Sequence, residues 1–211
     1  MRKECKMVYT YDELDDSGKE KAREWYAQQV FDDSCDWEYV YEDAVRMAEL
    51  MGIEIDQRAW TNSHGFKGKE PCIYFSGFSS QGDGASFEGT YRYRKGAVKA
   101  IKAECNDAEL IRIAYALQEV QRKHFYRLYA TCKTSGNYCH SGCMSVEVEH
   151  KDDPYRHIGD AEGEVRQLMR DFADWIYERL EAEYDYQTSD EAVEENILAN
   201  EYEFYETGEP L

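Results

Sequence analysis

The sequence predicts an α+β fold in which a central antiparallel sheet is flanked by N-terminal and C-terminal helices. Apolar residues recur at helical spacing near both ends of the chain, whereas the middle alternates in the manner of strands. Hydrophobic residues make up 42% of the 211 residues and only three are proline, so a folded core is expected despite a net charge of −19. We expect one domain over residues 1–211: helical at 11–52, a sheet with inserted helices at 53–150, and acidic and helical at 160–211.

Two helices are predicted at the N-terminal end. Asp16 or Ser17 is a suitable N-cap for the first, which extends to about Val30. The second covers roughly Asp36–Met51, where apolar residues keep a 3.6-residue period, and Gly52 follows as a residue suited to helix termination.

The middle of the chain is expected to supply the sheet. Thr61–Pro71 is rich in Gly and polar residues and is predicted to be a loop. Aromatic and β-branched residues predict strands at 53–60, 72–78, 87–94, 125–134 and 143–150.

Two helices are inserted between these strands, at about 97–104 and 107–123. Asn106 or Asp107 would cap the second helix. Its inward residues are predicted to be Leu110, Ile113, Ala114, Leu117 and Val120.

The C-terminal end is predicted to be helical again, at about 164–184 and, after an N-cap at Ser189, as far as Tyr202. One face of the first of these helices is apolar. This face comprises Val165, Leu168, Met169, Phe172, Ile176 and Leu180.

Charge is distributed unevenly along the chain. Residues 156–211 contain four Arg against 17 Asp or Glu, whereas residues 58–130 contain 12 Lys or Arg against seven acids. An acidic surface repels bulk nucleic acid and anionic membranes. The expected partners are therefore a basic protein, or a small anion held by the basic middle.

A stripe of acids is predicted opposite the apolar face of the helix at 164–184. Its members are Asp171, Asp174, Glu178, Glu181 and Asp185. Spacings of three and four residues place carboxylates about 5 Å apart along a helix, comparable to nucleic-acid phosphates. The stripe is either a solvated face that aids solubility or a DNA-mimicking face that binds a basic protein. In the second interpretation, further partner-binding residues are Glu191, Glu194 and Glu195, with Tyr184, Tyr186, Tyr202 and Tyr205 as amphipathic anchors.

The segment FSGFSSQGDGASFEG suggests an alternative ligand site. Glycines permit close backbone approach, and basic side chains follow the segment at Arg92 and Arg94. A nucleotide would be held by these two arginines with Ser79, Ser80, Gln81, Gly82, Asp83 and Gly84. The segment matches neither the Walker A pattern nor the dinucleotide fingerprint, so a plain connection between strands is the competing interpretation.

Metal binding and catalysis find little support in the sequence. Cys132, Cys139, His140 and Cys143 have a spacing unlike that of zinc sites, and an adjacent Cys–His pair on a strand would point to opposite faces. No Ser, Cys or His forms a recognisable nucleophile motif. We therefore expect no metal, no cofactor and no enzymatic activity. Seven cysteines without framework spacing indicate reduced thiols in a cytoplasmic protein.

Several blocks of the chain resemble a known family. They are YTYDELDDSGKEKAREWY, MGIEID, IYFSGFSSQGDGASFEGTYRYRKGAVKAI, HSGC and DWIYERLEAEYDYQTSDEAVEENILANEYEF. Together these blocks are similar to a phage and prophage family of small acidic proteins often labelled "antitoxin of toxin–antitoxin stability system". The label implies non-enzymatic neutralisation of another protein. It supplies no catalytic or binding residues.

These observations lead to one functional hypothesis and one alternative. The first is a phage-type inhibitor, in the bacterial host cytoplasm, that binds a host defence or toxin protein through its acidic face. The alternative is a nucleotide-binding or signal-molecule-binding protein that uses residues 79–86 with Arg92 and Arg94.

Overall fold

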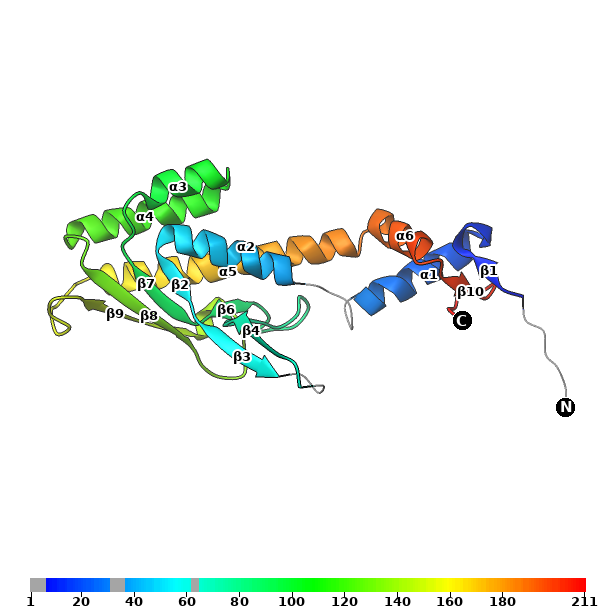
Figure 1. Ribbon diagram of the computed structural model, residues 1–211, viewed down its shortest axis with the longest axis horizontal. Coiled ribbons are helices and arrows are strands. Elements are labelled where there is room, and N and C mark those ends of the chain that lie inside the picture. Colours follow the sequence, from blue (N-terminus) through cyan, green and yellow to red (C-terminus); the bar gives the residue numbers. More distant parts are fainter. Residues whose placement is uncertain (1–6, 31–36, 62–64) are drawn as a thin grey trace. The chain divides into compact units, whose positions relative to one another are not determined.

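The computed structural model describes residues 7–30, 37–61 and 65–211, and it confirms the α+β fold (Figure 1). The chain divides into two compact units. Unit 1 comprises Met1–Trp37 and Leu180–Leu211, and unit 2 comprises Glu38–Arg179. The prediction of one domain with three consecutive segments did not anticipate this grouping, in which both ends of the chain share a unit.

Unit 1 is built mainly from two helices, α1 (Asp16–Gln29) and α6 (Asp190–Ala199). A short strand pair, β1 (Tyr9–Thr10) with β10 (Glu203–Phe204), and the 3₁₀ turn η1 (Tyr11–Glu13) complete it. Its small core consists of Tyr11, Leu14, Ala22, Val193, Ile197 and Phe204.

The helix ends of unit 1 follow from local chemistry. Asp15, one residue before the predicted cap, accepts a hydrogen bond from Gly18 N at 2.7 Å and begins α1. Ser189 caps α6 as predicted. That helix ends at Ala199 and not at Tyr202, because Glu201 adopts a left-handed φ of 52°.

Unit 2 contains a four-stranded antiparallel sheet in the order β2-β7-β8-β9. Its strands are β2 (Ile53–Ile55), β7 (Gly89–Arg92), β8 (Leu128–Thr134) and β9 (Met144–His150). Side chains alternate between a buried face and an exposed face, as in Tyr91–Ala130–Val148 against Arg92–Tyr129–Glu149. The predicted strands at 125–134 and 143–150 are confirmed, with the first starting three residues later.

The other predicted strands lie where they were expected, but two of them divide into shorter strands that pair in different sheets. Residues 53–60 form β2 and β3 (Gln57–Thr61), residues 72–78 contain β5 (Ile73–Phe75), and β6 (Ala85–Phe87) leads into β7. Asp56, Cys72 and Glu88 lie at the three changes and are joined by backbone hydrogen bonds of 2.7–2.9 Å. The three changes of strand partner therefore lie side by side, joined by these hydrogen bonds.

The prediction of a loop over Thr61–Pro71 was wrong. Lys67–Pro71 forms β4, which pairs in register with β3. Cross-strand contacts hold this hairpin: Arg58 lies 2.7 Å from Glu70, and Trp60 covers Gly68 so closely that a Cβ there would lie 2.6 Å from the indole. These contacts join opposite strands of the hairpin, and residue composition alone does not reveal them. Residues 62–64 lie outside the described residues.

Helices pack on the buried face of the sheet. They are α2 (Glu38–Met51), α3 (Ala97–Glu104), α4 (Ala108–Lys123) and α5 (Ala161–Gln187), whose last eight residues belong to unit 1. The predicted inward residues of α4 and α5 are all buried. Gly52 follows α2 with φ 89° as predicted, whereas the predicted start at Asp36 lies outside the described residues.

Two contacts fix α5 against the rest of unit 2. Phe172 meets Phe87 edge to face at 5.6 Å between ring centroids, and Trp175 Nε1 donates to Asp107 at 2.9 Å. Asp107 also caps α4 through the amides of Glu109 and Leu110. One carboxylate thus ties two helices together.

Candidate functional site

Four of the five predicted stripe residues on α5 are exposed. Asp174 and Glu178 lie in unit 2, while Glu181 and Asp185 lie in unit 1. None of the four has a salt-bridge partner among the described residues. They are separated by four, three and four residues, which keeps them on one side of the helix, away from Phe172 and Ile176.

Asp171 is the exception in the stripe. Its side chain is only 16% exposed, is ion-paired with Arg112, and accepts a hydrogen bond from Gln167 at 2.8 Å. At 100° per residue Asp171 lies at the flank of the apolar face, where the helix meets α4. Its charge is therefore used inside unit 2 and is not presented to a partner.

On α6, Glu191 and Glu195 are exposed, but Glu194 belongs to an internal network. Its Oε1 accepts from Tyr11 Oη at 2.7 Å and from Arg23 Nη1 at 2.8 Å. The bond from Tyr11, followed by that from Arg23, holds the pKa of Glu194 below its ordinary value, against the opposing effect of burial. Glu194 thus joins η1, α1 and α6.

The four predicted tyrosine anchors divide into two pairs. Tyr186 is 66% exposed and Tyr202 is 38% exposed, whereas Tyr184 and Tyr205 are half-buried. The Tyr202 ring meets Trp25 edge to face at 5.3 Å between centroids. An aromatic ring supported in this way presents apolar area at low entropic cost.

Residues 79–86, which we call the Gly/Ser loop, are held closed by the carboxylate of Asp83 within the loop. Asp83 Oδ2 accepts from the amides of Ser79 at 2.8 Å and Ser80 at 2.5 Å. These are the donors that a bound phosphate would require. Tyr177 Oη donates to Gly77 O at 3.4 Å and anchors the start of the loop to α5.

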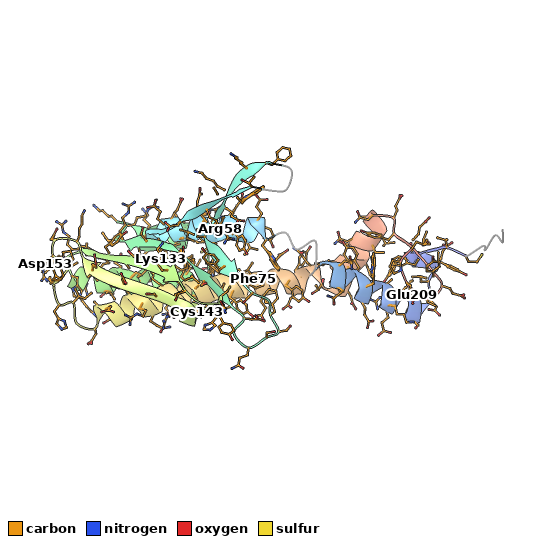
Figure 2. All side chains as sticks on the ribbon, turned by 90° about the horizontal axis from the view of Figure 1, so that it is seen from below. Arg58, Phe75, Lys133, Cys143, Asp153 and Glu209 are labelled. Atoms are coloured by element: carbon orange, nitrogen blue, oxygen red, sulfur yellow. The ribbon has the colours of Figure 1, made fainter. Side chains whose placement is uncertain are left out.

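The structure does not bring this loop together with Arg92 and Arg94. Strand β7 begins at Gly89, close to the loop, and ends at Arg92, so the strand carries Arg92 and Arg94 away from the loop. Arg92 and Arg94 line a pocket of about 430 Å³ with Glu49, Gly52 and Glu54, and no residue of 79–86 lines it. In Figure 2, Phe75, just before the loop, lies toward Cys143, while Asp153 lies beyond the opposite end of β9. Arg92 belongs to that opposite end, because it pairs with Tyr129, which pairs with Glu149.

The cysteine and histidine candidates are not gathered into one cluster within the described residues. Cys132 is fully buried, and burial raises the pKa of its thiol to about 12. Cys143 Sγ lies 3.3 Å from His140 Nε2, across the 3₁₀ turn η3 (Ser141–Cys143). Within the described residues, no group of three or more His, Cys, Asp or Glu is arranged to hold a metal ion.

Sequence reasoning missed two features, which are the contact between Cys143 Sγ and His140 Nε2 and a second pocket beside Arg92. The three-residue spacing in HSGC was a usable signal for the first, since a turn brings residues i and i+3 together. The second pocket draws its lining from three separate segments, so local pattern gives no signal for it.

The chain belongs to the family described as a domain of unknown function, DUF8835, whose model matches residues 37–190. The match includes the whole of unit 2, but of unit 1 only Trp37 and residues 180–190. No curated protein and no solved structure matches the chain. In the described part of the chain, helices that combine the length and the hydropathy needed to cross a bilayer are absent.

Proposed function

We propose that the chain is a non-enzymatic binding protein that neutralises another protein by covering its basic, nucleic-acid-binding surface with unit 1. One observation carries the proposal: residues 180–211 contain eleven Asp or Glu and no Lys or Arg. Among them, Glu181, Asp185, Glu191 and Glu195 are exposed, with no salt-bridge partner in the described residues.

Glu181 and Asp185 on α5, like Glu191 and Glu195 on α6, are four residues apart. To a basic surface, carboxylates at this helical spacing resemble a row of phosphates. Such a field attracts Lys and Arg side chains and accelerates encounter, most strongly at low ionic strength. Because these acids are not neutralised by neighbouring bases, their charge is available to a partner. Long-range attraction of this kind is screened within about 10 Å at 0.1 M salt.

Tyr186 and Tyr202 supply the apolar part of the proposed interface. Charge alone gives rate and orientation, while buried aromatic area gives most of the affinity in protein interfaces. The ring of Tyr202 packs against Trp25, whereas the ring of Tyr186 is the more exposed of the two.

The resemblance to acidic phage and prophage proteins suggests the setting. In that setting the partner is a host defence or toxin protein in the bacterial cytoplasm, and the chain acts on it by binding alone. Unit 2 would then be the scaffold that the family shares.

The test is capture from bacterial lysate at low salt, followed by measurement of the dissociation constant for the captured protein. An amide variant removes four of the exposed charges of unit 1, those on α5 and α6 without a salt bridge among the described residues: E181Q, D185N, E191Q and E195Q. A matched control removes four exposed charges of unit 2: E42Q, D43N, E147Q and D160N. A further variant, D174N with E178Q, tests separately whether the exposed stripe residues of unit 2 contribute to binding.

The unit 1 amide variant is expected to bind at least about tenfold more weakly, because each lost charge pair weakens association. The control is expected to stay within about twofold. Binding by the unaltered chain should weaken at least about tenfold between 0.05 and 0.3 M salt. Affinity independent of salt, or an equal loss in the control, contradicts the proposal.

A further inference from the structure

A second pocket of about 430 Å³ lies in unit 2, at the end of the sheet where β7 and β9 finish and β8 begins. Its lining includes Arg92, Tyr93, Tyr126, Arg127, Tyr129 and Lys151. The volume lies within the range of small-molecule sites. Asp153, labelled in Figure 2, marks this end of the sheet. We call this second pocket the tyrosine pocket.

The backbone beside the tyrosine pocket is strained. Phe125 and Tyr126 have left-handed φ values of 53° and 60°, which bulky residues rarely adopt. Gln121 holds this turn: its buried side chain bonds both N and O of Leu128, at 3.1 and 2.9 Å, and its carbonyl accepts from Tyr126 N at 2.7 Å.

That strain positions an aromatic pair, of which Tyr93 is half-buried and Tyr126 is exposed. The ring of Tyr126 lies 4.3 Å from the ring of Tyr93 between centroids, at an interplanar angle of 36°. Tyr126 is nevertheless 42% exposed and Phe125 is 75% exposed. A turn that served only to fill the core would bury these rings, so the arrangement presents an aromatic platform to the pocket.

The charge of the tyrosine pocket is opposite to that of the chain. Arg92, Arg127 and Lys151 face a single lining acid, Glu149. Arg92 pairs with Glu54 at 3.1 Å and Arg127 with Asp152 at 3.6 Å, but about half or more of each side chain is exposed. Such surface pairs are weak and exchange readily for a ligand anion. Lys151 has no ion-pair partner among the described residues.

One buried polar atom of the lining is unpaired. His150 is 3% exposed, and its Nδ1 has no hydrogen-bond partner within the described residues. Buried polar atoms are nearly always bonded to protein, water or ligand, so an unpaired one calls for an explanation. A polar ligand in the adjoining pocket supplies one.

We propose that the tyrosine pocket binds a nucleoside phosphate. The base stacks on the Tyr93–Tyr126 pair, and the phosphate is held by Arg92, Arg127 and Lys151. A single nucleotide is favoured over a nucleic-acid strand, because the basic lining is confined to three side chains of one pocket, whereas a strand requires a row of phosphate contacts. This site lies in unit 2 and is independent of the acidic surface of unit 1.

The test is calorimetric titration of the full chain with a panel of nucleoside mono- and triphosphates. Adenosine, inorganic phosphate and a single-stranded 12-mer RNA form separate arms. Tyr93→Ala is expected to weaken nucleotide binding about tenfold, within the range of base–aromatic stacking. Tyr93→Phe keeps the ring and should bind within about twofold of the unaltered chain. Lys151→Ala should weaken binding several-fold.

Two matched controls lie outside the pocket. Tyr115→Ala removes a 45% exposed ring from α4, and Lys133→Ala removes an exposed lysine from β8. Neither should change nucleotide affinity. The amide variant of unit 1 should also bind nucleotide normally, which separates failure of this proposal from failure of the proposed function.

Three results overturn the proposal. The first is no binding of any nucleotide at millimolar concentration. The second is an equal response to inorganic phosphate alone, which would leave the tyrosines without a role. The third is tighter binding of the 12-mer than of every mononucleotide, which would make the ligand a strand.

Discussion

The two units of the molecule differ most in charge. Unit 1 contains 21 Asp or Glu and six Lys or Arg, whereas unit 2, about twice as long, contains 23 and 19. Most of the net charge therefore belongs to the smaller unit. Net charge averaged over the chain hides a nearly balanced scaffold and a strongly acidic module.

The units also differ in how much of each the family model matches. The DUF8835 match covers all of unit 2 but little of unit 1. The tyrosine pocket lies in the shared unit and the acidic surface lies mainly in the other. The two proposals therefore concern different units of the chain.

The largest expected effect comes from the core of unit 2. Phe172→Ala removes a fully buried ring that contacts Phe87 and Trp175, and should lower the free energy of unfolding by about 3–5 kcal/mol. Hydrogen exchange followed by mass spectrometry should show faster exchange in residues 38–179. Equal acceleration at residues 190–204 would mean that the two cores form one cooperative unit, and the division would fail. Phe66→Ala, which alters a 69% exposed ring, is the control.

Thiol reactivity should distinguish buried from accessible sites within unit 2. Because burial raises the pKa of Cys132 to about 12, almost no thiolate forms there at pH 8, whereas Cys143 is only half-buried and lies beside His140. Iodoacetamide should modify Cys143 on the order of 100-fold faster than Cys132. Peptide mass spectrometry over time measures the two rates, and similar rates would contradict the burial of Cys132.

Loss of the Asp107 carboxylate should cost less. Burial raises the pKa of Asp107, but bonds from Leu110, Trp175 and Glu109 together outweigh burial and lower it. Asp107→Ala removes the α4 cap, and should destabilise the chain by about 1–2 kcal/mol in urea unfolding. Asp107→Asn, which keeps an oxygen to cap α4 but loses the carboxylate that accepts from Trp175, should cost less than Asp107→Ala. An equal cost would assign the effect to the tie to α5 alone.

The smallest effect is expected in unit 1, at Glu194. The pKa of Glu194 is lowered in the folded chain, so its stabilising contribution is present above the unfolded pKa of about 4.3 and is lost as pH falls through the folded value. Glu194→Gln should cost about 0.5–1 kcal/mol at pH 7, a modest value because the side chain is 41% exposed. Urea unfolding at pH 7 and below pH 4 should show the difference shrinking. Glu195→Gln, on the exposed side of α6, removes a charge that has no salt bridge among the described residues and is the control.

Local pattern predicted the helices well, because a helix is specified by residues near one another in the sequence. The apolar faces of α4 and α5, the cap at Ser189 and the termination at Gly52 all followed from spacing and residue type. The acidic stripe was predicted for the same reason, except that tertiary contact with Arg112 withdraws Asp171.

The features that depend on distant residues could not be predicted. The partner changes at Asp56, Cys72 and Glu88 depend on hydrogen bonds among three strands. The Gly/Ser loop had suitable composition for an anion, but only the structure shows that Asp83 occupies its amides. The tyrosine pocket requires the end of β7, the strained turn after α4 and the residues after β9 to meet.

The central claim, that unit 1 takes the place of nucleic acid on a basic partner, is tested most directly by competition. A fluorescent oligonucleotide is bound to the captured protein, and its anisotropy is followed during titration with the full chain at low salt. The account predicts complete displacement by the unaltered chain, and at least about tenfold more chain needed for the unit 1 amide variant. A captured protein that binds the chain while keeping its oligonucleotide would contradict the account.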